Sequence, residues 1–365
     1  MNGNRLQILD LSRFVAAIMV VFFHYTFNGI LNGKISSITQ LPAISDITKY
    51  GRFGVELFFM ISGYVILISA KKGSPLAFAK SRVIRLYPAY WAGLILTSCF
   101  ASILGGEMMG VDLKMVITNF SMLQSFLGVG HVDGVYWTLA YELQFYAIVF
   151  VMLLFSNLLS IEKFILAWAI LINISVYSGI YISSLLGGYY SYFIAGALLS
   201  IYSSTKSKGT LVLIALSVYP CMKHALAKVA EFTAATTIVY NSIIVCSIIA
   251  MFFILFFLQN TNSLRGLIIP KSYRIGALTY PIYLIHAHIG YMLISRYANE
   301  NNYAWVCSLV ILFIITMAYL INLIVERKMK NIWINVFSFF LTKPIETIDF
   351  AIKTLTNKIV RKSKA

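Results

Sequence analysis

Long apolar stretches dominate the chain, and most of them are long enough to cross a membrane. A hydrocarbon core of about 30 Å takes roughly 20 apolar residues in a helix. Stretches of this kind lie at residues 12–31, 53–70, 86–104, 136–155, 164–182, 187–203, 209–220, 235–258, 276–297 and 304–325. The pattern predicts an all-α polytopic membrane bundle of about ten transmembrane helices. The seventh stretch is short, and its polar continuation over 221–228 either extends it or lies at the interface.

Composition supports the same class of protein. The chain has 365 residues, of which 59% are hydrophobic and 12% are charged, whereas soluble domains carry about 25% charged residues. These values exclude a soluble enzyme, a disordered tail protein and a disulfide scaffold. No CxxC pattern or Cys/His spacing occurs, so we expect neither disulfides nor a metal site.

Basic residues give an expected orientation. The formal net charge is +16, from 29 Lys and Arg against 13 Asp and Glu. If the N-terminus is cytoplasmic and all ten stretches cross, 22 of the 29 basic residues lie on the cytoplasmic side. Membrane proteins concentrate Lys and Arg there, so we expect both termini in the cytoplasm and no nucleic-acid partner. Nine of the 22 lie in the C-terminal tail, so the loops alone give weaker support, and a seventh stretch that did not cross would invert everything after it.

The chain is expected to divide into a transmembrane domain over 1–330 and a basic cytoplasmic tail over 331–365. The tail has an amphipathic pattern with scattered Lys. Such helices lie on membrane surfaces that carry anionic lipid.

Ionisable residues inside the predicted spans are candidate functional residues, because a charge in hydrocarbon is energetically costly. Arg13 and His24 lie 11 residues apart in the first span. That separation corresponds to about 16 Å of helix rise and places both on one face. Arg13 then lies at the cytoplasmic mouth and His24 near the middle of the membrane. The structural alternative is a snorkelling Arg and a His that bonds to a neighbouring helix.

Two further arginines, Arg82 and Arg85, come just before the predicted third span. At i, i+3 both guanidinium groups can face one site, and their forked geometry suits phosphate oxygens. The alternative is simple anchoring of a cytoplasmic loop. Their expected location on the same membrane face as Arg13 favours a phosphate site.

Four more candidates are expected nearer the outer side. Glu142 lies roughly 9 Å below the outer surface by helix rise, where it can orient a His or a sugar hydroxyl. Tyr136 and Trp137 precede it and offer an aromatic face, or else belong to an interfacial belt. Glu56 is a candidate for binding the acceptor; a surface ion pair with the neighbouring Arg52 is the alternative.

A last pair of ionisable residues lies in the ninth span. His286 is expected at about the depth of His24, in a structural or substrate-orienting role. His288 points to another face, and we expect it to serve in packing.

Five segments in order resemble the acyltransferase 3 family of integral-membrane O-acyltransferases. Segment 9–24 keeps an Arg-x10-His pattern, and segment 54–64 carries Glu56 where the family more often has Asp. The others read Arg-x-x-Arg-x-Tyr-Pro-x-Tyr-Trp over 82–91, Tyr-Trp-Thr-Leu-x-x-Glu over 136–142 and Tyr-Leu-x-His over 283–286. The resemblance extends from about residue 5 to residue 330. We expect a stand-alone member without the hydrolase-like domain that often follows.

The resemblance implies a bacterial cytoplasmic membrane protein that moves an acyl group, usually acetyl, from acyl-coenzyme A to a hydroxyl of a cell-surface carbohydrate. It makes His24 the catalytic residue, and Arg13, Arg82 and Arg85 the other motif residues. Acyl-CoA is then a donor substrate, and no permanently bound cofactor or metal is expected. The glycan, its hydroxyl, the acyl group and the oligomeric state are not given by the sequence.

Charge and chemistry then combine into one mechanistic hypothesis. The arginines hold the phosphates of cytoplasmic coenzyme A, and the pantetheine arm threads toward His24, which acts as general base. An acyl-His intermediate is the alternative to direct transfer. Glu142, with Tyr136 and Trp137, positions the acceptor. A transporter or flippase with a His24, Glu142 and His286 proton relay is the competing class of function, and a membrane scaffold is a weaker one.

Overall fold

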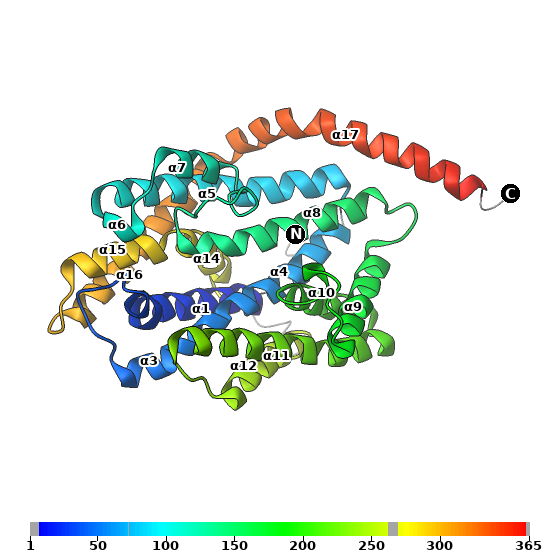
Figure 1. The fold of residues 1–365 in the computed structure, drawn as a ribbon. Coiled ribbons are helices and arrows are strands. Elements are labelled where there is room, and N and C mark those ends of the chain that lie inside the picture. Colours follow the sequence, from blue (N-terminus) through cyan, green and yellow to red (C-terminus); the bar gives the residue numbers. More distant parts are fainter. Residues whose placement is uncertain (1–6, 72, 262–268, 363–365) are drawn as a thin grey trace.

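The computed structural model describes residues 7–71, 73–261 and 269–362, and over these residues it is all-helical, with no β-strand (Figure 1). Arg5, Lys72, Arg265 and Lys364, which entered the charge count, lie outside the described residues. The long helices are α1 (Gln7–Phe23), α4 (Gly54–Lys71), α5 (Pro75–Leu104), α8 (Trp137–Leu154), α9 (Ile161–Ser178), α10 (Tyr190–Thr205), α11 (Lys208–Thr236), α12 (Ser242–Gln259), α14 (Ser272–Ile285), α15 (Ala287–Tyr297), α16 (Tyr303–Leu320) and α17 (Lys330–Lys362).

Short elements connect them: a π-helical turn η1 (His24–Asn28), α2 (Gly29–Leu31), α3 (Pro42–Thr48), η2 (Lys49–Phe53), α6 (Gly106–Met109), α7 (Leu113–Phe120), η3 (Gly134–Tyr136), η4 (Ser184–Leu186) and η5 (Ile321–Lys328).

The predicted all-α membrane bundle is confirmed. Among the described residues, eight helical segments are long and apolar enough to cross a membrane, and the bent pair α14 and α15 makes a ninth. The sixth predicted stretch corresponds to α10, which has 16 residues and is buried throughout its first three turns. The doubtful seventh stretch and its polar continuation form one helix of 29 residues, α11.

Contacts between helix ends sort the connections into two groups at opposite ends of the bundle. At one end, Lys71 pairs with Glu162 and donates to Ser204. At the other end, Thr39 bonds to Glu300 and Lys49 donates to the carbonyl of Val239. The arrangement is that of a chain that crosses the bundle back and forth.

The centre of the bundle is the pair α4 and α10. Gly63 packs against the backbone of Phe193, and Gly196 packs against the backbone of Met60. A Cβ atom at either glycine would overlap with a carbonyl oxygen. Small residues at a helix contact let membrane helices approach closely and pack without a hydrophobic driving force.

Two departures from regular α-helix lie side by side in the bundle. The first span changes to a π-helical turn at His24, and the ninth span bends by 66° between α14 and α15, at His286. The Tyr25 hydroxyl donates to the His286 carbonyl over 2.8 Å, which satisfies a backbone group near the bend. The ring centroids of His24 and His286 are 5.0 Å apart. Local π-helix is frequent at functional sites, so the contact between His24 and His286 is a candidate part of a site.

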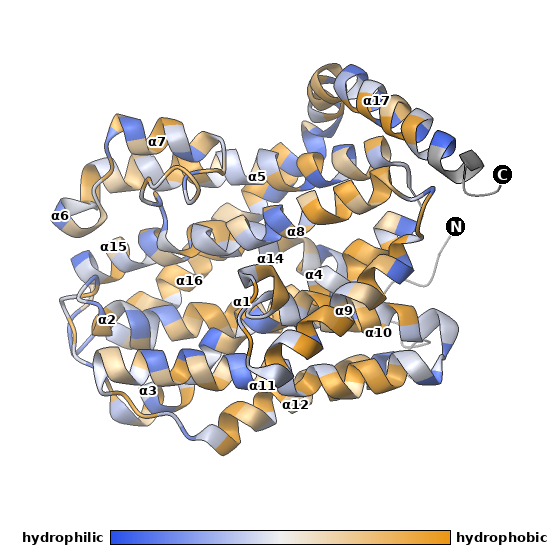
Figure 2. Ribbon diagram, turned by 45° about the vertical axis from the view of Figure 1, so that its right-hand side comes forward, coloured by the Kyte–Doolittle hydropathy of each residue, from blue (hydrophilic) through white to orange (hydrophobic). Residues whose placement is uncertain are grey.

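The C-terminal segment forms one helix of 33 residues, α17. Its beginning packs on α5, where Trp91 contacts Trp333 and Phe337. Its later part extends past the bundle (Figure 1). Hydrophilic and hydrophobic residues alternate along it in Figure 2, and Phe339 and Phe350 are exposed, as the amphipathic pattern predicts.

Candidate active site

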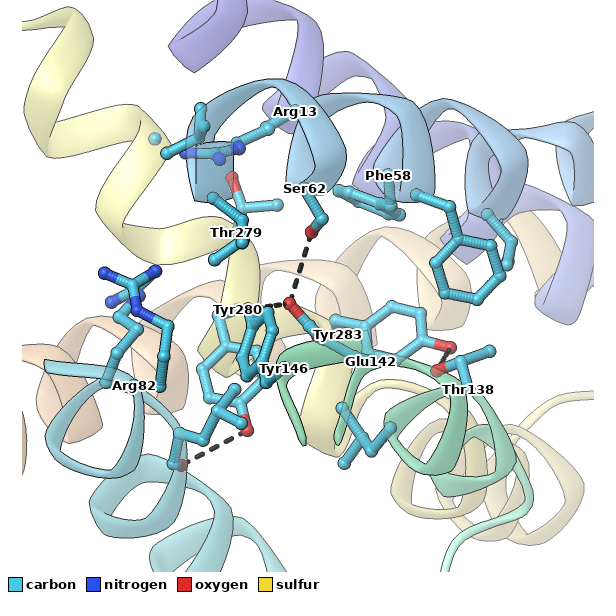
Figure 3. Close-up of a pocket in the computed structure, with 18 of the residues that line it drawn as sticks. Arg13, Phe58, Ser62, Arg82, Thr138, Glu142, Tyr146, Thr279, Tyr280 and Tyr283 are labelled. Carbon is cyan, nitrogen blue, oxygen red and sulfur yellow. Dashed lines mark hydrogen bonds between the residues drawn. The ribbon is translucent and has the colours of Figure 1, made fainter. Parts of the chain in front are cut away.

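A cavity of about 400 Å³ lies between α1, α4, α5, α8 and α14 (Figure 3). It combines cationic, acidic and aromatic side chains with an apolar wall. Its ionisable lining residues are Arg13, Arg82, Arg85, Glu142, Tyr146, Tyr280 and Tyr283. Volume and lining are those of a small-molecule site, which is usually apolar with a few convergent polar groups. We call it the arginine cavity.

The arginines come from two helices that are distant in the sequence. Arg82 and Arg85 lie two to three turns inside α5, because that helix begins at Pro75, with the Ser74 hydroxyl capping the Ala77 amide. The sequence placed them just before the third span, so this boundary was wrong. Arg13 of α1 lines the same cavity.

The three guanidinium groups differ in their partners. Arg85 forms an ion pair of 2.7 Å with Glu326, and Arg13 lies 4.0 Å from Asp10. Arg82 bonds to two serine hydroxyls, those of Ser81 and Ser69, and no carboxylate of the described chain lies within ion-pair distance. Its positive charge is therefore the least compensated of the three.

Glu142 lies within the arginine cavity. Its Oε1 accepts hydrogen bonds from the hydroxyls of Ser62 and Tyr146 (Figure 3). The Tyr146 ring in turn lies 5.9 Å from the Arg82 guanidinium. Glu142 is thus connected to the arginines through Tyr146, and among the described residues it forms no hydrogen bond with Tyr136 or Trp137.

His24 does not line the arginine cavity. Its Nδ1 bonds to the hydroxyl of Tyr291, and the Asn28 amide lies 3.4 Å from the same nitrogen. The ring of His286 lies beside it. His24 is half-buried, whereas His286 is 1% exposed.

Tyr283 contacts both the cavity and the imidazole of His286. One side of it lines the cavity together with Phe58, and its ring lies 5.6 Å from that of His286. Its hydroxyl is 2.7 Å from that of Thr138 and donates to the Val135 carbonyl over 3.1 Å. These bonds hold the ring in place.

Arg13 and His24 both face the broken helix of the ninth span. Arg13 shares the cavity wall with Gly276 and Thr279 of α14, and His24 contacts His286, at the junction of α14 and α15. The arrangement agrees with the helical spacing of the two residues.

Three of the predicted acceptor residues lie elsewhere. Glu56 is 3% exposed on the face of α4 that does not line the cavity, and its Oε2 has no hydrogen-bond partner among the described residues. Tyr136 is buried against Tyr90, and Trp137 packs on Tyr141 and Tyr189. The structure does not gather these residues with Glu142 or His24.

His288 belongs to a polar network on the far side of Tyr291. Its Nδ1 donates to the Val132 carbonyl over 2.9 Å, and its Nε2 lies 2.7 Å from the Lys34 Nζ. The buried Asp133 carboxylate accepts the His288 backbone amide over 2.9 Å. These bonds anchor α15 to two loops, which is a packing role.

Sequence reasoning missed several residues of the site. Asn28 carries a local signal, because it lies four residues after His24 on the same helix. Tyr291 and Glu326 carry none, since their contacts join residues 267 and 241 positions apart. Tyr283 belongs to the Tyr-Leu-x-His segment over 283–286, but that segment did not show its place in the cavity wall, and Tyr146 was not singled out.

Comparison with known proteins supplies the family. No curated protein and no solved structure matches the chain. The family model for acyltransferase 3, described as an acyltransferase domain, matches residues 6–324. This match covers nearly the whole chain and includes every segment from which the resemblance was drawn. The chain therefore belongs to the acyltransferase 3 family of membrane acyltransferases.

Proposed function

We propose that this membrane acyltransferase moves an acyl group, most simply acetyl, from cytoplasmic acyl-CoA to a hydroxyl of an exported or cell-surface carbohydrate. The observation that carries the proposal is the arginine cavity. It gathers three guanidinium groups from α1 and α5, and its far wall, Tyr283, borders the His286 and His24 pair. The guanidinium groups that would bind the donor and the imidazole of His24 then lie at the two ends of one proposed path.

The arginines suit the donor. Coenzyme A is polyanionic, and guanidinium forks bind phosphate oxygens with charge-assisted hydrogen bonds. The excess of basic residues in the expected cytoplasmic loops and tail supports an inner-membrane orientation with both termini in the cytoplasm. In that orientation the arginine cavity opens toward the pool of acyl-CoA.

The imidazole supplies the proton transfer. His24 takes the proton of the acceptor hydroxyl as the oxygen attacks the thioester carbonyl. The new C–O bond forms, the C–S bond breaks, and the same proton passes from His24 to the leaving thiolate, which gives free coenzyme A. His286 borders His24 and orients the acceptor hydroxyl.

The position of Tyr283 has a mechanistic consequence. We infer that the Tyr283 ring closes the arginine cavity toward His24 as a partition, since it lines the cavity and lies 5.6 Å from the His286 ring, so that the thioester reaches His24 when this ring moves aside. A closed partition keeps the acyl group away from water until the acceptor is in place. Glu142 holds Tyr146 beside Arg82 and so shapes the donor side.

The acceptor side of the proposal rests on the family resemblance. Glu56, Tyr136 and Trp137 remain candidate acceptor residues, although they do not lie together. The carbohydrate class of acceptor comes from the family resemblance. A lipid bilayer surrounds the apolar outer surface of the bundle.

The test is transfer of label in a defined membrane assay. Purified protein in lipid vesicles is given radiolabelled acetyl-CoA and membranes of the native host from which the gene has been deleted. We expect alkali-labile label, the mark of an O-ester, in the carbohydrate fraction. Label that appears equally without the protein, or transport of a solute that needs no thioester, would overturn the proposal.

A further inference from the structure

The hydroxyl of Tyr291 lies beside His24, and Tyr291 does not line the arginine cavity. It bonds to His24 Nδ1, and it accepts the Asn28 amide over 3.1 Å. Tyr291 is 2% exposed. Two residues of the π-helical turn His24–Asn28 therefore converge on one buried phenol oxygen.

The contact settles which nitrogen of His24 is available for chemistry. Both hydrogen bonds of this imidazole involve Nδ1, and Nε2 has no hydrogen bond to any residue that the structure describes. The residue as a whole is half-buried. An imidazole with one nitrogen held and the other open is the arrangement that a general base requires.

The neighbouring His286 follows the same pattern with a different partner. Its Nδ1 donates to the Tyr283 carbonyl over 2.8 Å, and its Nε2 is buried without a partner among the described residues. Its position is fixed by backbone, whereas that of His24 depends on a side chain. Only the His24 arrangement is therefore open to a conservative test by substitution.

We infer that Tyr291 is a positioning residue for His24, an inference that rests on the proposed acyl transfer. In the catalytic state the His24 Nδ1–H donates to the Tyr291 oxygen, whose second lone pair accepts the Asn28 amide. Nε2 then carries the lone pair that receives the proton of the acceptor hydroxyl. When Nε2 is protonated, the phenol oxygen stabilises the imidazolium through the same Nδ1–H bond.

A tyrosine suits this place better than a carboxylate. A neutral partner avoids the energetic cost of a charge at membrane depth, and its oxygen can accept the Nδ1–H that leaves Nε2 free to take a proton. The ring is held closely, since a Cβ atom at Gly29 would lie 2.5 Å from Tyr291 Cε1. Lys34 adds a cation 5.9 Å from the ring centroid.

The test separates positioning from donor binding. Acetyl transfer is measured in vesicles at varied acetyl-CoA, with the gene-deleted host membranes in fixed excess. We expect Tyr291→Phe to lower apparent kcat by about 10-fold to 100-fold, less than the roughly 10²–10⁴ that a general base contributes, and to leave KM for acetyl-CoA unchanged. Tyr64→Phe is the matched control. It removes a buried hydroxyl that lies away from the site and donates to the Asn260 side chain over 3.0 Å.

A second comparison asks whether the two residues act as a unit. In a His24→Ala background, Tyr291→Phe should cause no further loss, since groups that act through one another are not additive. Asn28→Ala should lower kcat in the same direction by a smaller factor. If Tyr291→Phe does not yield monodisperse protein, Asn28→Ala replaces it in the test.

The outcomes separate the positioning role of Tyr291 from the proposed acyl transfer. Wild-type kcat in Tyr291→Phe, or a loss that appears in KM alone, overturns the positioning role and leaves the acyl transfer standing. Absence of transfer by the wild-type protein overturns the proposed function itself.

Discussion

The arginine cavity and the imidazole pair are built in different ways, although they belong to one path. The cavity collects residues with local sequence signals, such as Arg82 and Arg85 on one face of α5. The imidazole region depends on contacts between the first and ninth spans, where a π-helical turn meets a 66° bend. The arginine cavity is distinguished by its clustered positive charges, and the imidazole pair by the irregular backbone around it.

The two regions serve two tasks, donor binding and proton transfer. Binding a flexible polyanion needs positive charge and tolerates variation in its exact placement. Proton transfer needs one nitrogen held at a fixed angle within hydrogen-bond reach of the reacting group. Substitutions in the two regions should therefore affect different kinetic constants.

Removing the imidazole should give the largest effect. His24→Ala should lower transfer by about 10²–10⁴-fold, the usual contribution of a general base, with unchanged affinity for coenzyme A. Label transfer and calorimetric titration with coenzyme A measure the two quantities on the same vesicles.

The control for that loss is His131→Ala. His131 lies in the loop between α7 and η3, where burial lowers its pKa, so it too is a neutral imidazole near pH 7. Equal loss from both variants, or wild-type transfer by His24→Ala, would remove His24 as the base.

Removing the least compensated guanidinium should affect the other region. Arg82→Ala should raise KM for acetyl-CoA by about 10-fold to 100-fold, the range for hydrogen bonds to charged groups, with little change in kcat. Arg85→Ala should act in the same direction but less, because Glu326 already pairs with Arg85. Arg274→Ala is a matched control, since that arginine is exposed beside Tyr273. A fall in kcat alone would contradict the division of tasks.

Loosening the partition should couple the two regions. Tyr283→Phe removes the contacts with Thr138 and Val135, each worth about 1 kcal/mol. We expect about tenfold faster hydrolysis of acetyl-CoA without acceptor, measured as free thiol. Tyr192→Phe loses a buried bond of 2.7 Å to the Cys221 carbonyl and should leave hydrolysis unchanged. Slower hydrolysis in Tyr283→Phe would argue against a partition.

The smallest effect is expected at the cavity edge. Glu326→Gln removes the carboxylate that competes with phosphate for Arg85. Partly exposed ion pairs contribute about 0.2–1 kcal/mol, so KM for acetyl-CoA should fall by about 1.4-fold to fivefold. Asp349→Asn removes a comparable pair with Lys353 on α17 and serves as the control. A higher KM in Glu326→Gln would mean that Glu326 holds Arg85 in its binding position.

Much of the architecture could be predicted from the sequence, because apolar length alone decides which segments cross a membrane. The start of α5 was the clearest error. Hydropathy stops at the charged residues Lys80, Arg82 and Arg85, whereas the helix continues back to Pro75. Charged side chains facing a cavity do not interrupt a helix.

The site was predictable in part, for a physical reason. Arg13 and His24 share a helix, so their spacing already gives their relative placement. The partners that define their roles, Tyr291 and Glu326, lie far away in the sequence. Glu142 shows the same limit, since its place in a predicted span could be read from the sequence but its position in the arginine cavity, connected to Arg82 through Tyr146, could not.

The central claim is that the arginine cavity takes an anionic donor from the cytosolic face, opposite the loop that follows His24. Its most direct test is sided labelling with a membrane-impermeant maleimide, in a background without the four native cysteines. Ser81 lies in the cavity wall and Asn32 is exposed beyond His24, so each is replaced by cysteine, as Ser81→Cys and Asn32→Cys. The account predicts that Ser81→Cys reacts only in inside-out vesicles and is protected by acetyl-CoA, while Asn32→Cys reacts only from the opposite face. Reaction of both from one face, or no protection by acetyl-CoA, would contradict it.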